Sequence, residues 1–303
     1  MLEVNVKSQT IKQPSTKSAW FAYLLLEFEH TRVGTQLSRS KRIGPLSIQR
    51  AFYPEGKDCS HIYLLHPPAG IVSGDSLSVH IKNHDHAHSL VTTPGANRFY
   101  RARDDLNIGD PKQEQNTTIE LDNKAVCEHF PQETIIYSGA CAFNTINISL
   151  KKHSVYLGWD ISCLGLPHSG KPFSKGSFTQ INKISCEGRI IYHDRLSLSA
   201  NSSVFHHKAG LDGRSVYGTF LAYASKNQIS QAELESLITR LREVVCTENA
   251  QDKISISQLR QLLVIRYLGE HSEECKNLFL KLWQNIRPLY INKSATLPRI
   301  WFT

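Results

Sequence analysis

The stretch that decides the fold runs from Leu65 to Ala102 and reads LHPPAGIVSGDSLSVHIKNHDHAHSLVTTPGANRFYRA. It holds three turn signals: Pro-Pro-Ala-Gly at 67–70, Ser-Gly-Asp at 73–75 and Thr-Thr-Pro-Gly at 92–95. Between the turns, apolar and polar residues alternate with a period of two, and Leu77, Val79 and Ile81 share one side. This alternation predicts a half-buried β-strand held between rigid turns.

The same pattern extends outward over residues 20 to 228. Short runs rich in β-branched and aromatic residues alternate with turn signals, which is typical of an all-β sandwich, barrel or helix. The polar segment 104–116, with Gly-Asp-Pro at 109–111, predicts a loop. Strands are expected at 22–28, 62–65, 117–121, 135–137, 146–150, 155–157, 189–192, 196–198 and 218–223.

After residue 229 the pattern changes to a helical one. Ser230 and Glu233 form a capping box, and apolar residues follow at helical spacing up to Leu241. A second helix is expected over 257–269, capped by Ser257 and stopped by Gly269. A third is expected over 272–286.

The third helix is followed by Pro288, which is expected just beyond its end. No repeat or linker divides the chain, so a single domain is predicted. The predicted organisation is an N-terminal tail (1–19) and one domain (20–303), with a β-rich part (20–228), a helical part (229–290) and a C-terminal segment (291–303).

Composition limits the compartment and the class of protein. The chain has 303 residues, of which 40% are hydrophobic, and no apolar run of 18 residues that would predict a membrane span. Its first 20 residues lack the apolar core of a signal peptide. Seven scattered cysteines without a C-x-x-C pair predict free thiols. A cytoplasmic protein is therefore expected.

The net charge is +8 and the pI is about 9.1. The basic residues are spread out, with small groups at 39–42 and 151–152, and no nucleic-acid-binding motif accompanies them. We therefore expect no nucleic-acid partner. An acidic protein partner is favoured, because complementary charge speeds encounter.

Further motifs occur in a fixed order along the chain. They are FYPEG at 52–56, LGWD at 157–160 with CLG at 163–165, RYLG at 266–269 and PRIW at 298–301. Together with the stretch at 65–102, they resemble the urease accessory protein family UreD, called UreH in some organisms. The resemblance covers residues 20 to 303.

This resemblance implies a β-helix-like fold with a few C-terminal helices and a non-enzymatic role in urease maturation. A UreD-like protein would act as a scaffold or chaperone that bridges UreF, and through it the GTPase UreG, to the urease apoprotein. No cofactor would be tightly bound, and Ni²⁺ would pass transiently through an internal route. The chain has no nucleotide-binding motif, so GTP hydrolysis belongs to the partner.

In that picture, the acidic residues of the motifs line the nickel route: Asp75, Asp160 and Asp194. Carboxylate oxygens hold nickel weakly and release it readily, which suits a conduit. At Asp194 the family commonly has Glu. For each carboxylate, a turn cap or an ion pair with an arginine is the alternative interpretation. His88, at a position common in the family, completes the predicted transient nickel-binding set.

Four histidines at even positions (His80, His84, His86 and His88) would share one face of an unbroken strand, where imidazoles can chelate a metal. Alternatively, a hairpin turn at 83–85 scatters them. Two other functions therefore stay open: a metal-binding enzyme that uses this cluster, and an adaptor with no metal role.

Four motif positions depart from the family pattern. Asn97 and Arg98 stand where Thr and Lys are usual, and Ala69 and Ser73 stand where glycine is usual. Glycine often marks a positive φ, so the last two departures pose the question whether Ala69 or Ser73 has one.

Overall fold

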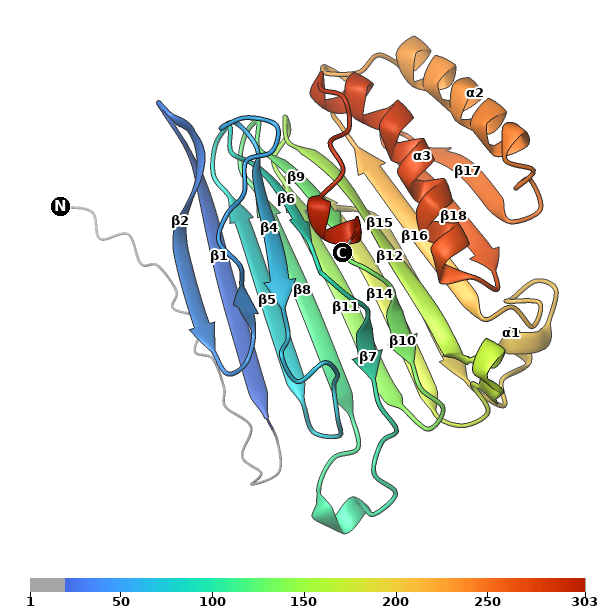
Figure 1. Cartoon of the computed structure of the whole chain (residues 1–303). Helices are drawn as coiled ribbons and strands as arrows, with labels where there is room; N and C mark the ends of the chain where they lie inside the picture. Colours follow the sequence, from blue (N-terminus) through green and yellow to red (C-terminus); the bar gives the residue numbers. More distant parts are fainter. Residues whose placement is uncertain (1–19, 303) are drawn as a thin grey trace.

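The computed structural model describes residues 20–302, which form two β-sheets packed face to face with helices over one outer side (Figure 1). One sheet has 7 strands and the other has 11. The mainly β class with a few C-terminal helices is confirmed. The predicted tail, 1–19, lies outside the described residues.

The order of the strands in space differs from their order in the sequence. From edge to edge, the 7-stranded sheet consists of β15 (Arg189–Ser199), β14 (Ser177–Cys186), β11 (Cys141–Leu150), β8 (Gln113–Leu121), β5 (Ser76–Asn83), β1 (Phe21–Thr31) and β2 (Gly34–Ile43). The 11-stranded sheet consists of β17 (Ile254–Leu259), β18 (Leu262–Gly269), β16 (Val216–Tyr223), β12 (Val155–Leu166), β9 (Val126–Phe130), β6 (His88–Thr92), β4 (Ser60–Leu65) and β3 (Ser47–Ile48), with β7 (Asn97–Phe99), β10 (Thr134–Ile136) and β13 (Lys171–Pro172) beside this path.

The helices are α1 (Ser203–His206), α2 (Gln231–Thr247) and α3 (Ser272–Ile291), with 3₁₀ turns η1 (Leu106–Ile108), η2 (Pro167–Ser169) and η3 (Arg299–Phe302). Figure 1 shows α2 and α3 together over the part of the 11-stranded sheet that holds β16 and β18. None of the helices in residues 20–302 has the length and apolarity that crossing a bilayer requires.

Successive strands of the middle of the chain alternate between the two sheets. β5, β8, β11 and β14 pair in parallel in the 7-stranded sheet. β6, β9 and β12, which follow β5, β8 and β11, pair in parallel in the other sheet. Each pass of the chain thus adds one strand to each sheet, an arrangement compatible with the β-helix-like expectation.

Two apolar cores hold the molecule together. The first lies between the sheets and the second lies beneath α2 and α3. β12 separates them, with Tyr156 in the first core and Trp159 in the second. Strands covered on both faces read as continuous apolar runs, which explains why β12 shows no clean alternation.

The predicted helix over 257–269 is wrong, because this segment forms the antiparallel pair of β17 and β18. Ile254 and Ile256 alternate with exposed Ser255 and Ser257 in β17. In β18, residues 262–265 are buried on both faces, so their apolar run does not distinguish a strand from a helix. The part 229–290 is therefore mixed, with a β-hairpin between two helices.

The other two predicted helices are present. Ser230 and Glu233 form both bonds of the capping box at the start of α2. Pro288 lies inside α3 and not beyond its end, since the helix continues to Ile291. Asn292, with φ of +56°, ends α3 in the left-handed region and donates its N–H to the Pro288 carbonyl at 3.1 Å.

The loop expected over 104–116 is also shorter than predicted. β8 begins at Gln113, and its inward-facing Gln113 is fully buried. Its amide donates to the carbonyls of Ile71 and Tyr100 at 2.7 and 2.8 Å. A strand can therefore begin with polar residues at this point, because their polar groups find partners between the sheets.

Ala69 and Ser73, the two motif residues that stand where glycine is usual, differ in backbone conformation. Ala69 has φ of +63°, whereas Ser73 is absent from the residues with positive φ in the described chain. The Ser73 hydroxyl instead accepts the Arg103 N–H at 2.8 Å. Only Ala69 occupies a conformation in which glycine has the advantage.

We expect Ala69→Gly to raise the free energy of unfolding by about 0.5 to 1 kcal/mol, because it removes the crowding of Cβ at positive φ. Ser73→Gly should lower it by about 1 kcal/mol, because the Arg103 N–H loses its acceptor. Urea unfolding of the two variants measures both changes. Equal shifts in the two variants would contradict this assignment of the turns.

Candidate functional site

Asp160 lies in β12 with its side chain directed between the two sheets. It is 6% exposed, and its Oδ2 accepts a hydrogen bond at 2.8 Å from the amide of Asn182 in β14 of the opposite sheet. Its Oδ1 is buried without a hydrogen-bond partner among the described residues. Burial raises the pKa of Asp160 to about 7. The hydrogen bond from Asn182 opposes this rise, and the negative charge of Asp194 adds to it.

Asp194 lies in β15, directly opposite Asn182 of β14 in the sheet register. Its carboxylate accepts a hydrogen bond from the Tyr217 hydroxyl at 3.3 Å and forms an ion pair with Arg266 at 3.1 Å. The structure thus brings two of the predicted acidic residues to Asn182: Asp160 is buried, whereas the Asp194 side chain is partly exposed in the edge strand. Asp194 thus has an arginine partner, as the alternative interpretation expected, and this partner is Arg266.

A row of amide side chains leads from Asp160 back across the 7-stranded sheet. Gln115, Asn144 and Gln180 face one another in register on β8, β11 and β14. The Asn144 amide donates to Gln180 at 2.9 Å, and the Gln180 amide donates to Asn182 at 3.1 Å. Because Asn182 in turn donates to Asp160, the row ends at this carboxylate.

The other end of the row reaches the opposite sheet again, where the amide of Asn97 in β7 donates to Gln115 at 2.7 Å. We call these five amides, Asn97, Gln115, Asn144, Gln180 and Asn182, the amide ladder. Asn144, Gln180 and Asn182 are each at most 5% exposed. A polar row of this length inside a sandwich core is unusual, because buried polar groups cost free energy unless they are paired.

Sequence reasoning missed the amide ladder. Its members alternate with outward-facing residues in their strands, so each occupies an inward position by parity. The signal in the sequence was the alternation of inward and outward residues. Asn144 lies two and four residues before Ile146 and Ile148 in β11, and Gln115 lies two and four residues before Thr117 and Ile119 in β8. Counting in steps of two from these buried residues would have placed the amides on the inward face.

Asp75 lies apart from this region. It precedes β5, which β8 and β11 separate from β14. It is 6% exposed, and its Oδ2 accepts the Val72 N–H at 2.9 Å, which is the turn cap of the alternative interpretation. Burial raises the pKa of Asp75 against the effects of that hydrogen bond and of Arg103.

His88, the fourth predicted site residue, lies at the start of β6 on the helix-covered side of its sheet. Its Nε2 lies 2.9 Å from Glu128 of β9, and Glu128 contacts α3. Asp160 points to the other side of the same sheet, toward Asn182. The structure therefore separates His88 from Asp160 and Asp194.

Around His88 lies a buried ion network, which we call the Arg287 network: Glu55, His61, His88, Glu128 and Arg287. Arg287 of α3 is fully buried and donates to both oxygens of Glu55 at 2.8 Å and to those of Glu128 at 2.9 to 3.1 Å. His61 contacts Glu55 at 2.8 Å, so each carboxylate has one histidine and shares the arginine.

These contacts keep both carboxylates ionised. Burial alone would raise the pKa of Glu55, but hydrogen bonds from His61 and Arg287 outweigh it and lower the value to about 2. For Glu128, burial is likewise outweighed by the hydrogen bond with His88 and the charge of Arg287, and its pKa is lowered. The Trp283 indole also donates to Glu128 at 2.8 Å.

Cys59 is buried beside this network, and burial raises its pKa well above the usual value. Ligand-type atoms of Glu55, Cys59 and His61 lie within 4.8 Å of one another, and so do those of Cys59, His88 and Glu128. In both groups the carboxylate already binds Arg287. A cation there would have to displace the guanidinium, so the arrangement favours a structural role.

The remaining histidines of the predicted chelating face do not converge. His80 of β5 lies against Glu120 at 3.3 Å, and His84 lies against Asp122 at 3.2 Å. His86 has φ of +64°, in the turn between β5 and β6. The turn that the alternative interpretation placed at 83–85 therefore separates these side chains from His88, as that interpretation expected.

Comparison with known proteins gives consistent matches over nearly the whole chain. Residues 21–302 match the family model described as UreD urease accessory protein. A protein of Psychromonas ingrahamii named urease accessory protein UreD is 55% identical over 293 residues, which are 95% of each chain. Proteins of the same name from Marinomonas sp. and Vibrio parahaemolyticus are 39% and 36% identical, over 94% and 95% of this chain and 91% and 98% of theirs.

Proposed function

The chain belongs to the UreD family of urease accessory proteins and serves urease maturation, and we propose that it does so as a non-enzymatic scaffold that passes nickel to the urease apoprotein through its own interior. In this proposal it binds UreF, and through UreF the GTPase UreG. Ni²⁺ is its cargo and is not held tightly. The proposed compartment is the cytoplasm, which the seven free cysteines support.

The observation that carries the nickel route is a set of buried oxygens without hydrogen-bond partners among the described residues: Asn144 Oδ1, Asp160 Oδ1 and Ser162 Oγ. Buried polar atoms are nearly always paired, so unpaired ones directed between the two sheets call for a ligand or water. Ser162 follows Asp160 by two residues in β12 and faces the same side. Together with the amide ladder, these oxygens offer a passing cation successive weak ligands.

The chemistry of these oxygens suits transfer better than storage. Nickel prefers imidazole over carboxylate and carbonyl oxygen, so an oxygen-lined route holds it weakly. The buried histidines His61 and His88 lie in the Arg287 network, outside this route. The +8 net charge also supports docking to acidic protein surfaces, which speeds encounter between partners.

We expect Asp160→Asn to lower nickel-dependent urease activation by about tenfold or more, the scale on which oriented groups at metal sites act, while UreF and the urease apoprotein stay bound. The variant removes the charge and keeps the shape and the acceptor for Asn182. Co-expression with the accessory proteins and urease, followed by copurification and a urease assay, measures both quantities.

Glu120→Gln is the matched control, since Glu120 is a partly exposed carboxylate of β8 that contacts His80. It should activate urease like the wild type. If Asp160→Asn activated urease like the wild type, the result would favour an adaptor protein without a metal role. Tight stoichiometric metal in the isolated protein would favour a metal-binding enzyme.

A further inference from the structure

The proposed nickel route does not involve the RYLG motif at 266–269, although the arginine of this motif lies beside the route. Arg266 of β18, Thr219 of β16 and Asp160 of β12 are register partners, so their side chains share one face of the 11-stranded sheet. That face meets the 7-stranded sheet, in which Asp194 forms the ion pair with Arg266. The row therefore leads from the buried Asp160 to an arginine whose side chain is 43% exposed.

Arg266 and Asp194 belong to a polar cluster at the edge of the sandwich, which we call the edge cluster: Tyr192, Asp194, Tyr217 and Arg266. β15, which carries Tyr192 and Asp194, is an edge strand of its sheet. One guanidinium nitrogen of Arg266 lies 3.1 Å from Asp194 Oδ2 and donates to the Tyr192 hydroxyl at 3.3 Å. The Tyr217 hydroxyl donates to the same carboxylate oxygen at 3.3 Å. Asp194 therefore contacts one cation and one neutral donor.

The ion pair of the edge cluster is open to solvent, in contrast to the Arg287 network. The Asp194 side chain is 25% exposed, so its carboxylate is within reach of an ion from solvent. Partly exposed ion pairs are weak, because water replaces either partner at little cost. Arg287 is fully buried and has no such exchange with water. Of these two arginines, Arg266 is therefore the one that can leave its carboxylate.

The chemistry of the edge cluster favours a divalent cation over a monovalent one. Burial raises the pKa of Tyr192 to about 12 and also raises that of Tyr217, so both hydroxyls are neutral near pH 7. With Asp194 they provide oxygen ligands, which hold Ni²⁺ weakly. A monovalent cation carries no more charge than the guanidinium already at Asp194, whereas Ni²⁺ carries twice as much and gains by displacing it.

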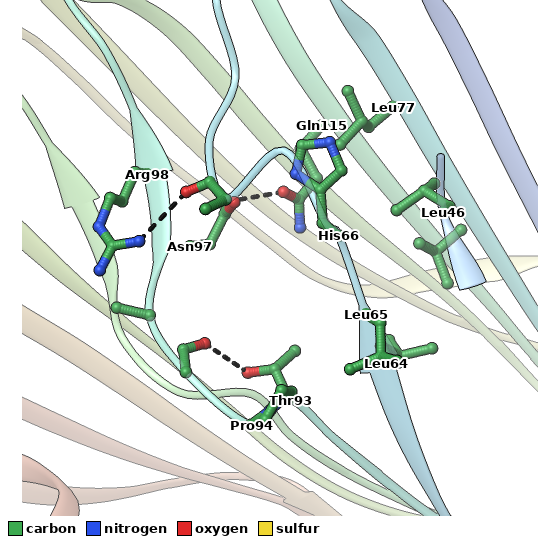
Figure 2. A pocket seen from close by; sticks show the side chains of 14 residues that line it. Leu46, Leu64, Leu65, His66, Leu77, Thr93, Pro94, Asn97, Arg98 and Gln115 are labelled. Atoms are coloured by element: carbon green, nitrogen blue, oxygen red, sulfur yellow. Dashed lines mark hydrogen bonds between the residues drawn. The ribbon is translucent and has the colours of Figure 1, made fainter. Parts of the chain in front are cut away.

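The opposite end of the amide ladder has a different character. There Asn97 donates to Gln115 beside a pocket of about 250 Å³ with mainly aliphatic walls (Figure 2). The described residues that line this pocket include Arg98 and no carboxylate. Of the two ends of the ladder, the one at the edge cluster therefore attracts a cation more strongly.

We propose that Arg266 is the gate of the nickel route: it occupies Asp194 until Ni²⁺ displaces it, and its return to Asp194 favours release of the ion. With the guanidinium in place, the edge is closed to monovalent cations. When Ni²⁺ binds Asp194, the partly exposed arginine side chain turns toward solvent, and repulsion between the two cations keeps the bound state short-lived. This inference rests on the proposed function, since it names the residue that controls entry to the same route.

The first test is a calorimetric titration of the isolated full-length protein with Ni²⁺. Arg266→Gln should bind Ni²⁺ about tenfold more tightly than the wild type, because the competing charge is removed from Asp194. Arg266→Lys keeps a positive charge and should bind within about threefold of the wild type. Adding Asp194→Asn to Arg266→Gln should abolish the gain. A purely structural arginine predicts no gain in any variant.

Arg39→Gln is the matched control. Arg39 pairs with Glu27 at 3.4 Å at the other edge of the same sheet, with comparable exposure, so the substitution also frees a carboxylate from its arginine. Glu27 alternates with the buried Leu26 and Phe28 and thus points away from the interior. Its Ni²⁺ affinity should equal that of the wild type. An equal gain in Arg39→Gln would reduce the effect to net charge and overturn the proposal, and so would an unchanged affinity in Arg266→Gln.

The second test locates the ion on the protein. Mn²⁺ broadens the NMR signals of nearby nuclei, so in the labelled wild type it should broaden those of Asp194 and Tyr217 before others. Thermal unfolding of each variant checks that it is folded. Broadening centred on the turn at 84–86 or on the Arg287 network would place the cation elsewhere, and the gate would then be wrong.

A urease activation assay separates the gate from the proposed function. With Arg266→Gln, the nickel concentration for half-maximal activation should fall about tenfold, in line with the tighter binding. If Asp160→Asn activated urease like the wild type, the proposed route would fail, while the titrations would still decide whether Arg266 competes with Ni²⁺ for Asp194. If Asp160→Asn lowered activation and Arg266→Gln changed neither the affinity nor the half-maximal concentration, the gate would be wrong and the route would stand.

Discussion

Replacing Arg287 by methionine will lower the free energy of unfolding by about 3 to 5 kcal/mol, the range measured when one partner of a buried ion pair is removed. Arg287 is fully buried and is the cation shared by Glu55 and Glu128. Without it, two carboxylates remain in the interior with their histidines and the Trp283 indole but without a permanent cation. Methionine keeps most of the volume, so the loss reports charge compensation more than packing.

Urea unfolding at pH 7 measures this loss. Lys281→Met is the matched control, because Lys281 lies in the same helix and its ion pair with Glu248 is about half exposed. That pair should contribute less than about 1 kcal/mol. Adding Glu128→Gln to Arg287→Met should recover part of the stability, since it removes one of the uncompensated charges. A loss in Arg287→Met no larger than in Lys281→Met would show that the network is not held by its arginine.

The same network predicts how stability changes in acid. The pKa of Glu55 is about 2 in the folded chain and 4.5 for the ordinary group. A lowered pKa contributes stability that is complete above about pH 4.5 and is lost as the pH falls toward 2. Arg287→Met should flatten this part of the stability curve.

Asp160→Asn will stabilise the protein by up to about 4 kcal/mol at pH 8 and leave its stability at pH 4 nearly unchanged. The pKa of Asp160 is about 7 in the folded chain and 3.8 for the ordinary group. A raised carboxyl pKa means that the folded chain binds the proton more tightly than the unfolded chain does. Stability is therefore lost as the pH rises from about 4 to 7. A difference of about three between the pKa values corresponds to about 4 kcal/mol.

The measurement is urea unfolding of wild type and variant at several pH values between 4 and 8. The difference between the two curves should grow with pH and level off above pH 7. Glu120→Gln is the control: the hydrogen bond with His80 lowers the pKa of Glu120, so removing this carboxyl should not make the protein more stable as the pH rises. A difference that is constant with pH would mean that Asp160 is ionised throughout, and its unpaired oxygen would then need another explanation.

If both Asp160→Asn predictions hold, the variant is more stable and less active. Residues that lower stability and support function are expected at functional sites. A variant that loses both stability and activation would instead point to a structural carboxylate. The two measurements on one variant thus distinguish a route residue from a packing residue.

The strands could be predicted where one face is apolar and the other polar, as in β5, whose inward residues are those that the alternation predicted. The hairpin of β17 and β18 could not, because residues 262–265 are apolar without a period and both faces are buried. The start of β8 could not be predicted either. Its inward residues Gln113 and Gln115 are amides, so the segment has no apolar face and resembles a loop.

In the candidate site, too, some residues could be predicted from the sequence and others could not. Asp160 and Asp194 belong to motifs of the family, so the resemblance was enough to select them. In the structure both lie next to Asn182. The Arg287 network has no local pattern, since Arg287 is 232 residues from Glu55 and 159 from Glu128. Only the folded chain brings these residues together.

That separation has a consequence for the order in which the protein is made. A ribosome completes Glu55 and Glu128, with the strands that bury them, long before it reaches residue 287. Until α3 emerges, the nascent chain carries two carboxylates in its second core without their cation, and the apolar face of β12 lacks its cover. The sandwich therefore cannot reach full stability before residues 272–291 have left the ribosome and formed α3.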